Sequence, residues 1–334
     1  MQTESDATNL SECDPRDHRW GVILAGGDGT RLLPLTRRIT GDDRPKQFCS
    51  VIGEETLLRQ TQRRISALVS PQRTLTVLTK THEAYYGDQV AAAPPSGMLI
   101  QPCNRGTAPA IIYSLLQLRE MDPQGIVAFF PSDHHFSDDE AFAGHMESAY
   151  TAAAALPEQV ILLGIPPDSP EVEYGWIEPG VFIDGFVPSS VFPVSRFWEK
   201  PCRKLAATLM AQGCLWNSFV MVGRVNAFLN PVRHTLPLLL AAFESILSSF
   251  STAFEEEELR ALYSGIPTTS FSQDVMSLRP SDLAVLCATG LGWSDLGEPG
   301  RVHSVLEGKG VKTEWGFSAG RQLGRVTARA EAAG

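Results

Sequence analysis

The sequence predicts an α/β protein with a Rossmann-like sheet that is mixed but mostly parallel and is flanked by helices. Continuous apolar runs at 20–25, 125–130 and 160–164 are typical of strands that are buried on both faces. Stretches with helical spacing alternate with these runs along the chain, which favours a sheet covered by helices. The 334 residues are enough to bury a sizeable core.

The first half of the chain supplies the regular elements. The first apolar run ends in a glycine-rich turn, which is a typical strand boundary. Pro109 stands near the start of a helical stretch, where the first turn tolerates it. The predicted elements of this half are, in order, strand 20–25, turn 26–31, helix 56–68, strand 74–79, helix 108–118, strand 125–130 and strand 160–164.

The second half is less regular. Residues 174–178 and 194–199 alternate between apolar and polar, so we expect two strands of a mixed sheet there. Residues 204–212 are predicted to form a short helix, and 234–263 is strongly helical in composition. The acidic run 255–258 is interpreted as a solvated helix face. The sequence contains no long repeat, which excludes a solenoid.

Composition limits the classes of function. The formal net charge is −10 at pH 7, so the chain lacks the positive face that sequence-independent nucleic-acid binding needs. No apolar run approaches the roughly 20 residues of a membrane span, and the first residues carry no signal-peptide pattern. The six cysteines are scattered without a CxxC pair, which disfavours structural zinc. We expect a cytoplasmic protein with free thiols, a disordered leader at 1–18, and neither nucleic-acid nor membrane partners.

The turn after the first strand has the properties of an anion site. Its sequence, Gly26-Gly27-Asp28-Gly29-Thr30-Arg31, lets the backbone approach a ligand closely. Successive N–H groups in such a turn form an anion-binding concavity, and the Arg31 guanidinium suits phosphate. The pattern is neither a P-loop nor a dinucleotide fingerprint, because no Gly-Lys-Ser/Thr closes it and Leu32 replaces the last glycine. A tight turn without a ligand is the alternative.

Two further segments belong to the same region. Residues 44–48, Arg-Pro-Lys-Gln-Phe, bring Lys46 as a second cation after Arg31. Ligands of parallel sheets lie beyond the carboxyl ends of the strands, where the glycine-rich turn and the turn 131–134 both fall. We therefore expect one shared site. Asp133 is either a turn or cap residue or a metal ligand, and the two histidines that follow it are interpreted as polar loop residues.

These segments and several later ones resemble, in order, the sugar-nucleotide pyrophosphorylases. The resemblance is closest to the mannose-1-phosphate guanylyltransferases and covers roughly residues 19–308. It implies a GT-A-like nucleotidyltransferase fold, with the catalytic domain at 19–308 and a short C-terminal extension at 309–334. The motifs are GGDGTRLLPLTR at 26–37, RPKQF at 44–48, NRGTAPA at 104–110, FPSDH at 130–134, EYGWIE at 173–178, FWEKP at 197–201, LWNS at 215–218 and GWSDLG at 292–297.

The resemblance implies a Mg²⁺-dependent nucleotidyltransferase that makes GDP-mannose and pyrophosphate from mannose-1-phosphate and GTP. A phosphate oxygen of the sugar phosphate attacks the α-phosphorus in line with the leaving pyrophosphate. The incoming phosphate is already ionised near neutral pH, so no strong general base is required. Catalysis is then mainly positioning and charge stabilisation between two polyanions.

The resemblance also assigns roles to residues. The metal pair is Asp133 and Asp295, which suits Mg²⁺ because this ion takes one or two carboxylates beside phosphate oxygens and waters. Arg31 and Lys46 are the charge stabilisers and complete the catalytic set. The nucleotide-binding residues are Ala25, Gly26, Gly27, Gly29, Thr30, Arg31, Lys46, Gln101, Arg105, Gly106, Thr107, Ala108 and Ser132. The residues for the sugar phosphate are Gly175, Glu178, Glu199, Lys200 and Asn217.

The chain departs from the family pattern at three places. Gly106 stands where most guanylyltransferases of this type have an Asn whose amide could read a base edge. Phe219 follows Trp-Asn-Ser where the family has Gly, and 272–275 reads Ser-Gln-Asp-Val instead of Ser-Ile-Asp-Tyr. Two alternatives stay open: the same reaction with another sugar-1-phosphate or nucleotide, or a sugar-nucleotide-binding regulator with weak catalysis.

The length adds one expectation. Some relatives append a phosphomannose isomerase domain or a hexapeptide β-helix, for which 334 residues leave no room. We therefore expect a single-function transferase. The oligomeric state stays open, a homodimer included.

Overall fold

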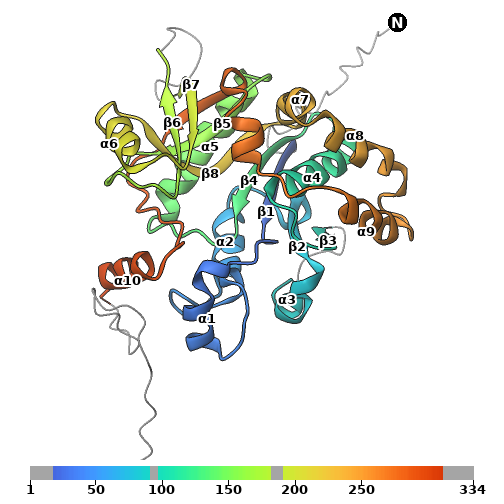
Figure 1. Cartoon of the computed structure of the whole chain (residues 1–334), viewed down its shortest axis with the longest axis horizontal. Helices are drawn as coiled ribbons and strands as arrows, with labels where there is room; N and C mark the ends of the chain where they lie inside the picture. Colours follow the sequence, from blue (N-terminus) through green and yellow to red (C-terminus); the bar gives the residue numbers. More distant parts are fainter. Residues whose placement is uncertain (1–17, 91–96, 182–190, 311–334) are drawn as a thin grey trace, which may run out of the picture.

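The computed structural model of the chain describes residues 18–90, 97–181 and 191–310. In this part, nine strands form one sheet in the order β3-β2-β1-β4-β8-β5-β9-β7-β6, and β8 also pairs with β6 (Figure 1). The strands are β1 (Arg19–Leu24), β2 (Thr74–Thr79), β3 (Met98–Gln101), β4 (Ile126–Pro131), β5 (Val160–Ile165), β6 (Gly175–Pro179), β7 (Val191–Glu199), β8 (Leu215–Arg224) and β9 (Leu283–Cys287).

The sheet is mixed but mostly parallel, as predicted. Strands β7 and β8 run opposite to the other seven described strands. The first four strands along the chain are all parallel to one another. All six strands predicted from the sequence are confirmed, as β1, β2, β4, β5, β6 and β7.

Neighbouring residues of one strand enter different hydrophobic layers. Val22 packs in one core cluster and Ile23 in the other, and Phe129 and Phe130 are divided in the same way. Because side chains alternate across a strand, a sheet covered on both faces needs apolar residues at every position. This explains why the central strands read as continuous apolar runs.

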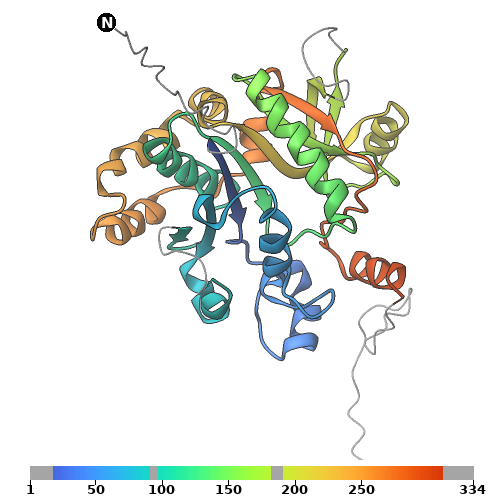
Figure 2. The same cartoon turned by 180° about the vertical axis from the view of Figure 1, so that it is seen from behind.

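Helices cover both faces of the sheet. Helices α4, α7, α8 and α9 lie together over one face (Figure 1), and α2 and α5 lie over the other (Figure 2). The helices predicted at 56–68, 108–118 and 204–212 are confirmed as α2, α4 and α6. The helices are α1 (Leu33–Thr40), α2 (Leu57–Ile65), α3 (Glu83–Val90), α4 (Thr107–Met121), α5 (Asp139–Ala155), α6 (Arg203–Ala211), α7 (Val225–Thr235), α8 (Pro237–Ser245), α9 (Glu255–Gly265) and α10 (Pro299–Gly308).

The helical stretch predicted at 234–263 is divided in the structure. Helix α7 ends at Thr235, and Leu236 takes a non-helical conformation before Pro237 opens α8. A residue before proline is disfavoured in the helical region, which explains the break. A non-helical segment then separates α8 from α9.

The acidic run at the start of α9 is solvated only in part. Glu256, Glu257 and Glu258 are exposed, whereas Glu255 is half-buried. Its carboxylate accepts hydrogen bonds from the Tyr113 hydroxyl and from Gln117 Nε2. The interpretation of the whole run as a solvated face is therefore wrong at Glu255, because this carboxylate ties α9 to α4.

A third, smaller hydrophobic cluster joins the ends of the described domain. Leu32 and Leu35, beside the glycine-rich turn, pack in one cluster with Leu296, Val302 and Leu306. The last two belong to α10, so this helix is anchored on the first turns of the chain.

The remaining expectations concern the ends and the thiols. The predicted leader at 1–18 and the extension at 309–334 lie almost entirely outside the described residues. The five cysteines in the described ranges are free, while Cys13 lies outside them. Within those ranges no helix is both long and apolar enough to cross a membrane.

Candidate active site

The carboxyl ends of β1 and β4 and the start of α4 line a cavity of about 290 Å³. This is the sheet edge where the sequence predicts a shared site. The cavity brings together the glycine-rich turn, the loop before α4 and the turn after β4. The predicted site residues that line it are Gly26, Gly27, Gln101, Gly106, Thr107, Ser132 and Asp133.

The glycine-rich turn is held by two side chains that sequence reasoning did not single out. Gln47 Nε2 donates hydrogen bonds to the carbonyl oxygens of Ala25 and Gly27, at 3.0 and 2.7 Å. Thr79 Oγ1 donates to the carbonyl oxygen of Gly26 at 2.9 Å. With these carbonyls engaged, the shape of the turn is fixed before a ligand arrives. The position of Gln47 directly after Lys46 is the signal that could have indicated it.

Lys46 connects the two halves of the site. Its buried ammonium lies 3.2 Å from Asp133 Oδ2 and donates to the backbone oxygens of Asp295 and Leu296, at 2.6 and 3.3 Å. A single cation therefore contacts the turn after β4 and a loop about 160 positions later in the chain. These three oxygens fix the position of the ammonium beside the turn after β4.

A short backbone bridge brings the Asp133 turn beside the Asp295 loop. His135 N–H donates to the Ser294 carbonyl at 2.8 Å, and Ser294 N–H donates back at 3.0 Å. The two histidines of this turn, interpreted from the sequence as polar loop residues, pack against other parts of the protein: His135 is only 3% exposed, and the His134 ring packs edge-on against Trp293. Burial lowers the pKa of His134, and it lowers that of His135 to about 4.

The carboxylate of Asp295 is held by a set of donors. Its Oδ1 accepts from the Tyr174 hydroxyl at 2.9 Å, from the Gly297 N–H at 2.9 Å and from Arg301 at 2.6 Å. Arg301 also pairs with Glu171 at 2.6 Å. Sequence reasoning missed Arg301, which lies on α10 outside every motif. Nothing in the local pattern distinguishes it from a surface arginine.

Charge keeps Asp295 ionised despite burial. Burial alone would raise its pKa, but neighbouring cations and the N–H of Gly297 lower it to about 2. Since burial pushes His134 toward its neutral form, Arg301 and Lys46 are the cations that act near neutral pH. The carboxylate is thus available as an anion throughout the physiological range.

A second charged group lies nearer the surface. Arg31 donates to Glu173 Oε2 at 3.2 Å, and Lys200 Nζ lies 3.8 Å from the same oxygen. Both cations are about half exposed. Thr30 is also exposed, whereas Gly29 is half-buried. Glu173 therefore joins a predicted triphosphate residue to a predicted sugar-phosphate residue, and an incoming phosphate would compete with it for both cations.

The predicted sugar residues lie on β6, β7 and β8, except Lys200, which directly follows β7. Gly175 pairs with Glu199, and a Cβ on Gly175 would lie 2.7 Å from the Phe197 ring. Glycine is therefore needed for packing inside the sheet as well as for any approach to substrate. Burial raises the pKa of Glu199.

Two other predicted sugar residues already have structural partners. Glu178 accepts a hydrogen bond from Trp198 Nε1 at 3.2 Å. Asn217 Oδ1 accepts from the Phe219 N–H at 3.1 Å. Their sugar-binding roles stay predictions.

The loop before α4 is built around the backbone of Thr269. Gly106 has φ +87°, and a Cβ there would lie 2.3 Å from the Thr269 carbonyl oxygen. The same oxygen accepts from the Ala108 N–H at 3.1 Å, and Thr107 Oγ1 accepts from the Phe271 N–H at 2.8 Å. Position 106 therefore has no room for a side chain, including the Asn that the family pattern has there.

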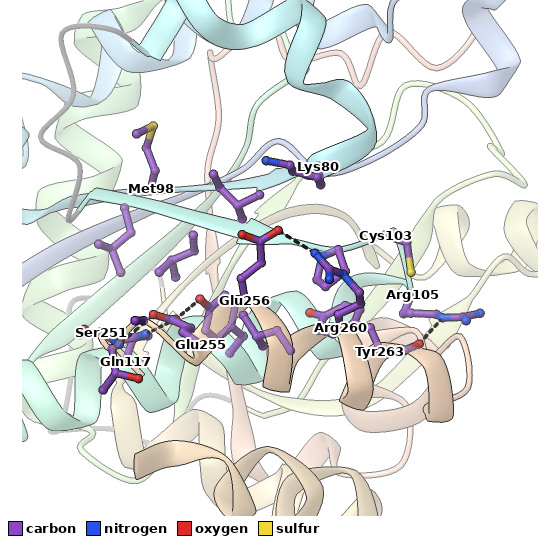
Figure 3. Close-up of a pocket in the computed structure, with 18 of the residues that line it drawn as sticks. Lys80, Met98, Cys103, Arg105, Gln117, Ser251, Glu255, Glu256, Arg260 and Tyr263 are labelled. Atoms are coloured by element: carbon purple, nitrogen blue, oxygen red, sulfur yellow. Dashed lines mark hydrogen bonds and ion pairs between the residues drawn. The ribbon is translucent and has the colours of Figure 1, made fainter. Parts of the chain in front are cut away.

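A larger cavity, of about 1030 Å³, lies between β3, α4 and α9 (Figure 3). Arg105 lines this cavity and not the smaller one, and its Nε donates to the Tyr263 carbonyl at 3.0 Å. Tyr263 in turn donates from its hydroxyl to Gln101 Oε1 at 2.9 Å. The nucleotide role of Arg105 stays a prediction, and its observed role is to join the loop to α9.

Few side chains in the described part of the site could bind a metal ion. Among the described residues, no group of three or more His, Cys, Asp or Glu side chains is arranged to hold an ion. Asp133 and Asp295 offer carboxylate oxygens, of which one each is engaged by Lys46 and Arg301. Two hard carboxylates fit Mg²⁺ that is completed by phosphate oxygens and waters.

Comparison with known proteins gives a family match. Residues 20–308 match the sequence model of a family described as nucleotidyl transferase. The chain is 32% identical over 295 residues to the xanthan biosynthesis protein XanB of Xanthomonas campestris pv. campestris, covering 86% of this chain and 60% of that protein. It is 30% identical over 285 residues to mannose-1-phosphate guanylyltransferase 2 of Escherichia coli O157:H7, covering 83% and 57%.

A solved structure is also similar to this chain in fold and sequence. The crystal structure described as mannose-1-phosphate geranyltransferase from Thermus thermophilus superposes with a TM-score of 0.71 and 29% sequence identity, covering 84% of this chain and 76% of that one. The chain spans less than two thirds of the length of the two curated relatives.

Proposed function

The chain belongs to the nucleotidyl transferase family, and from this premise we propose that it joins a sugar-1-phosphate to a nucleoside triphosphate with release of pyrophosphate. Mannose-1-phosphate and GTP are the proposed pair, since a 30% identical relative is named for mannose-1-phosphate guanylyl transfer. The product would be GDP-mannose.

The observation that carries this proposal is the position of Lys46. Its ammonium contacts the Asp133 carboxylate and the backbone of Asp295 next to the glycine-rich turn. The reaction must bring two polyanions together, so fixed cations beside an anion-binding turn are the feature it needs most.

The chemical step forms one bond and breaks one. An oxygen of the sugar phosphate bonds to the α-phosphorus, and the bond from that phosphorus to the bridging oxygen of pyrophosphate breaks. The nucleophile is already an anion, so no proton has to be removed. Lys46 stabilises the charge on the phosphates, while Arg31 and Lys200 exchange Glu173 for phosphate oxygens at the rim.

Asp133 and Asp295 are the residues that would hold Mg²⁺. The ion supplies neutralisation of phosphate charge when it is bound. Arg301, Tyr174 and the Gly297 N–H keep the Asp295 carboxylate ionised and fixed in orientation. The protein's own contribution is thus an Asp295 carboxylate that three donors hold in place.

The test is a pyrophosphate-release assay with purified protein, GTP, mannose-1-phosphate and MgCl₂. We expect release that depends on all three additions, with GDP-mannose formed in equal amount. Reactions without the sugar phosphate are the control for simple hydrolysis. Absence of pyrophosphate with every nucleotide and sugar phosphate tested would contradict the proposal.

A second candidate keeps the reaction and changes a substrate. Gly106 cannot carry the base-reading amide, and Phe219 lines the same cavity. A panel of ATP, CTP, GTP, UTP and dTTP against mannose-, glucose- and galactose-1-phosphate decides between the two. A higher kcat/KM for another pair would replace the proposed substrates.

A further inference from the structure

We propose that Phe219 is a nucleotide-binding residue that holds the nucleoside part of the substrate through its ring. This inference rests on the proposed function, because it takes the 290 Å³ cavity to be the nucleotide site. It concerns a residue at which this chain departs from its family, so the family pattern does not supply it.

The first observation is the irregularity of β8 at Phe219. Between the pairs Leu162–Met221 and Gly164–Asn217, β5 advances by two residues and β8 by four. Two extra residues of β8 therefore leave the regular ladder. Bulges of this kind redirect a side chain and occur preferentially next to functional sites.

Two side chains that precede Phe219 on β8 hold the bulge in place. Asn217 Oδ1 accepts from the Phe219 N–H at 3.1 Å. Ser218 Oγ donates to the Leu163 carbonyl at 2.6 Å and accepts from the Val220 N–H at 3.2 Å. The buried Asn-Ser pair thus stabilises a turn in the middle of a strand.

The second observation is the backbone conformation. Phe219 has φ +60°, the left-handed region that a bulky residue rarely occupies. Glycine, which the family has at this position, takes the conformation without steric cost. A phenylalanine kept in a strained conformation at a substrate cavity indicates a role for its side chain, since glycine would fit the backbone better.

The third observation is the location of Phe219. Phe219 is half-buried and lines the cavity beside Gly26, Gly106 and Thr107. Among the described lining residues it is the one phenyl ring, and Gly106 presents no side chain. At these two positions the cavity therefore offers the apolar side chain of Phe219 and no polar side chain. Nucleobases bind such surfaces by stacking or edge contact, independently of their hydrogen-bonding pattern.

The experiment measures GTP binding by calorimetry in MgCl₂ for the intact chain and for F219G and F219L. Glycine removes the ring and relieves the backbone, so the bulge is expected to persist; leucine keeps apolar bulk and the strained backbone but removes the ring face. F254G is the matched control, because Phe254 is a 67% exposed ring that lines neither cavity. Melting temperatures establish that each variant is folded.

We expect F219G to raise the Kd for GTP by about fivefold or more, which is the lower end of what base–aromatic stacking contributes. F219L should lie between F219G and the intact chain, and F254G should bind like the intact chain. The KM for the sugar phosphate at saturating GTP should change by less than about twofold, since only the nucleoside contacts the ring.

Two results would overturn this role: a Kd for GTP that F219G leaves within twofold of the intact chain, or a rise in the sugar-phosphate KM in place of the GTP effect. The binding titration needs no turnover. If the intact chain binds GTP but releases no pyrophosphate with any sugar phosphate, the proposed function fails while the titrations still decide the role of Phe219.

Discussion

Replacing Arg301 with methionine removes a guanidinium that pairs with Asp295 and Glu171, each at 2.6 Å, and keeps most of the apolar stem. The Asp295 side chain is only 11% exposed, so water cannot fully replace the lost partner. Its pKa falls from 3.8 to about 2 in the folded chain, which corresponds to roughly 2.5 kcal/mol. His134, the Gly297 N–H and Lys46 supply part of this lowering, but removal of Arg301 also leaves a buried charge undercompensated. We expect R301M to lower the free energy of unfolding by about 2 kcal/mol at pH 7.

The difference in unfolding free energy between the intact chain and R301M should depend on pH in one direction. The folded-state pKa of Asp295 is below its ordinary value, so its stabilisation is fully present above about pH 4. It is lost as the pH falls from about 4 through 2, where the carboxylate takes up a proton in the folded state. Glu171, whose pKa is also lowered against the effect of burial, acts in the same direction. The difference between the intact chain and R301M should therefore shrink across this window.

Urea unfolding, followed by tryptophan fluorescence at pH 7, 4 and 3, measures this difference. R260M is the matched control, because Arg260 pairs with Glu256 four residues earlier and the two side chains are 69% and 67% exposed. Exposed pairs contribute about 1 kcal/mol or less, so R260M should cost less than R301M. A loss in R301M that is no larger than in R260M, or that does not change with pH, refutes the reasoning.

The other predictions concern the proposed reaction and the loop before α4. K46M should lower kcat for pyrophosphate release by about a hundredfold or more; a variant that keeps a tenth of the activity argues against a role for Lys46 in charge stabilisation. D133N and D295N should each abolish Mg²⁺-dependent turnover and weaken Mn²⁺ binding measured by calorimetry in the presence of GTP, whereas unchanged Mn²⁺ affinity excludes them as ligands. G106N should lower the unfolding free energy by about 2 kcal/mol or more and should not increase preference for guanine, because its Cβ would clash with Thr269; a stable variant that gained selectivity would contradict the geometry.

The central strands could be predicted because their apolar runs are continuous. The continuous run at 125–130 predicts a strand and β4 forms there, whereas β8 (Leu215–Arg224) had no predicted counterpart. Its apolar run is interrupted by Asn217 and Ser218, whose polar groups are satisfied by backbone atoms of a bulge. The apolar periodicity of one segment cannot reveal these hydrogen bonds, because one acceptor, the Leu163 carbonyl, lies on the neighbouring strand β5.

The location of the site could be predicted from the sequence better than the contacts between its residues. The carboxyl ends of parallel strands meet at one edge, so the glycine-rich turn and the Asp133 turn could be expected together. The approach of Asp295 came from family resemblance alone, since it depends on a backbone bridge between His135 and Ser294. Arg301 could not be found, because its partners are set by the docking of α10.

The docking of α10 has a consequence for how the domain can open. Val302 and Leu306 pack beside the first turns of the chain, and Arg301 is paired to the carboxylates of Asp295 and Glu171. Helix α10 thus connects the residues beside the glycine-rich turn with Asp295 and Glu171. Detaching α10 would expose those two aliphatic side chains and break both ion pairs at once, so such a motion is costly and cooperative.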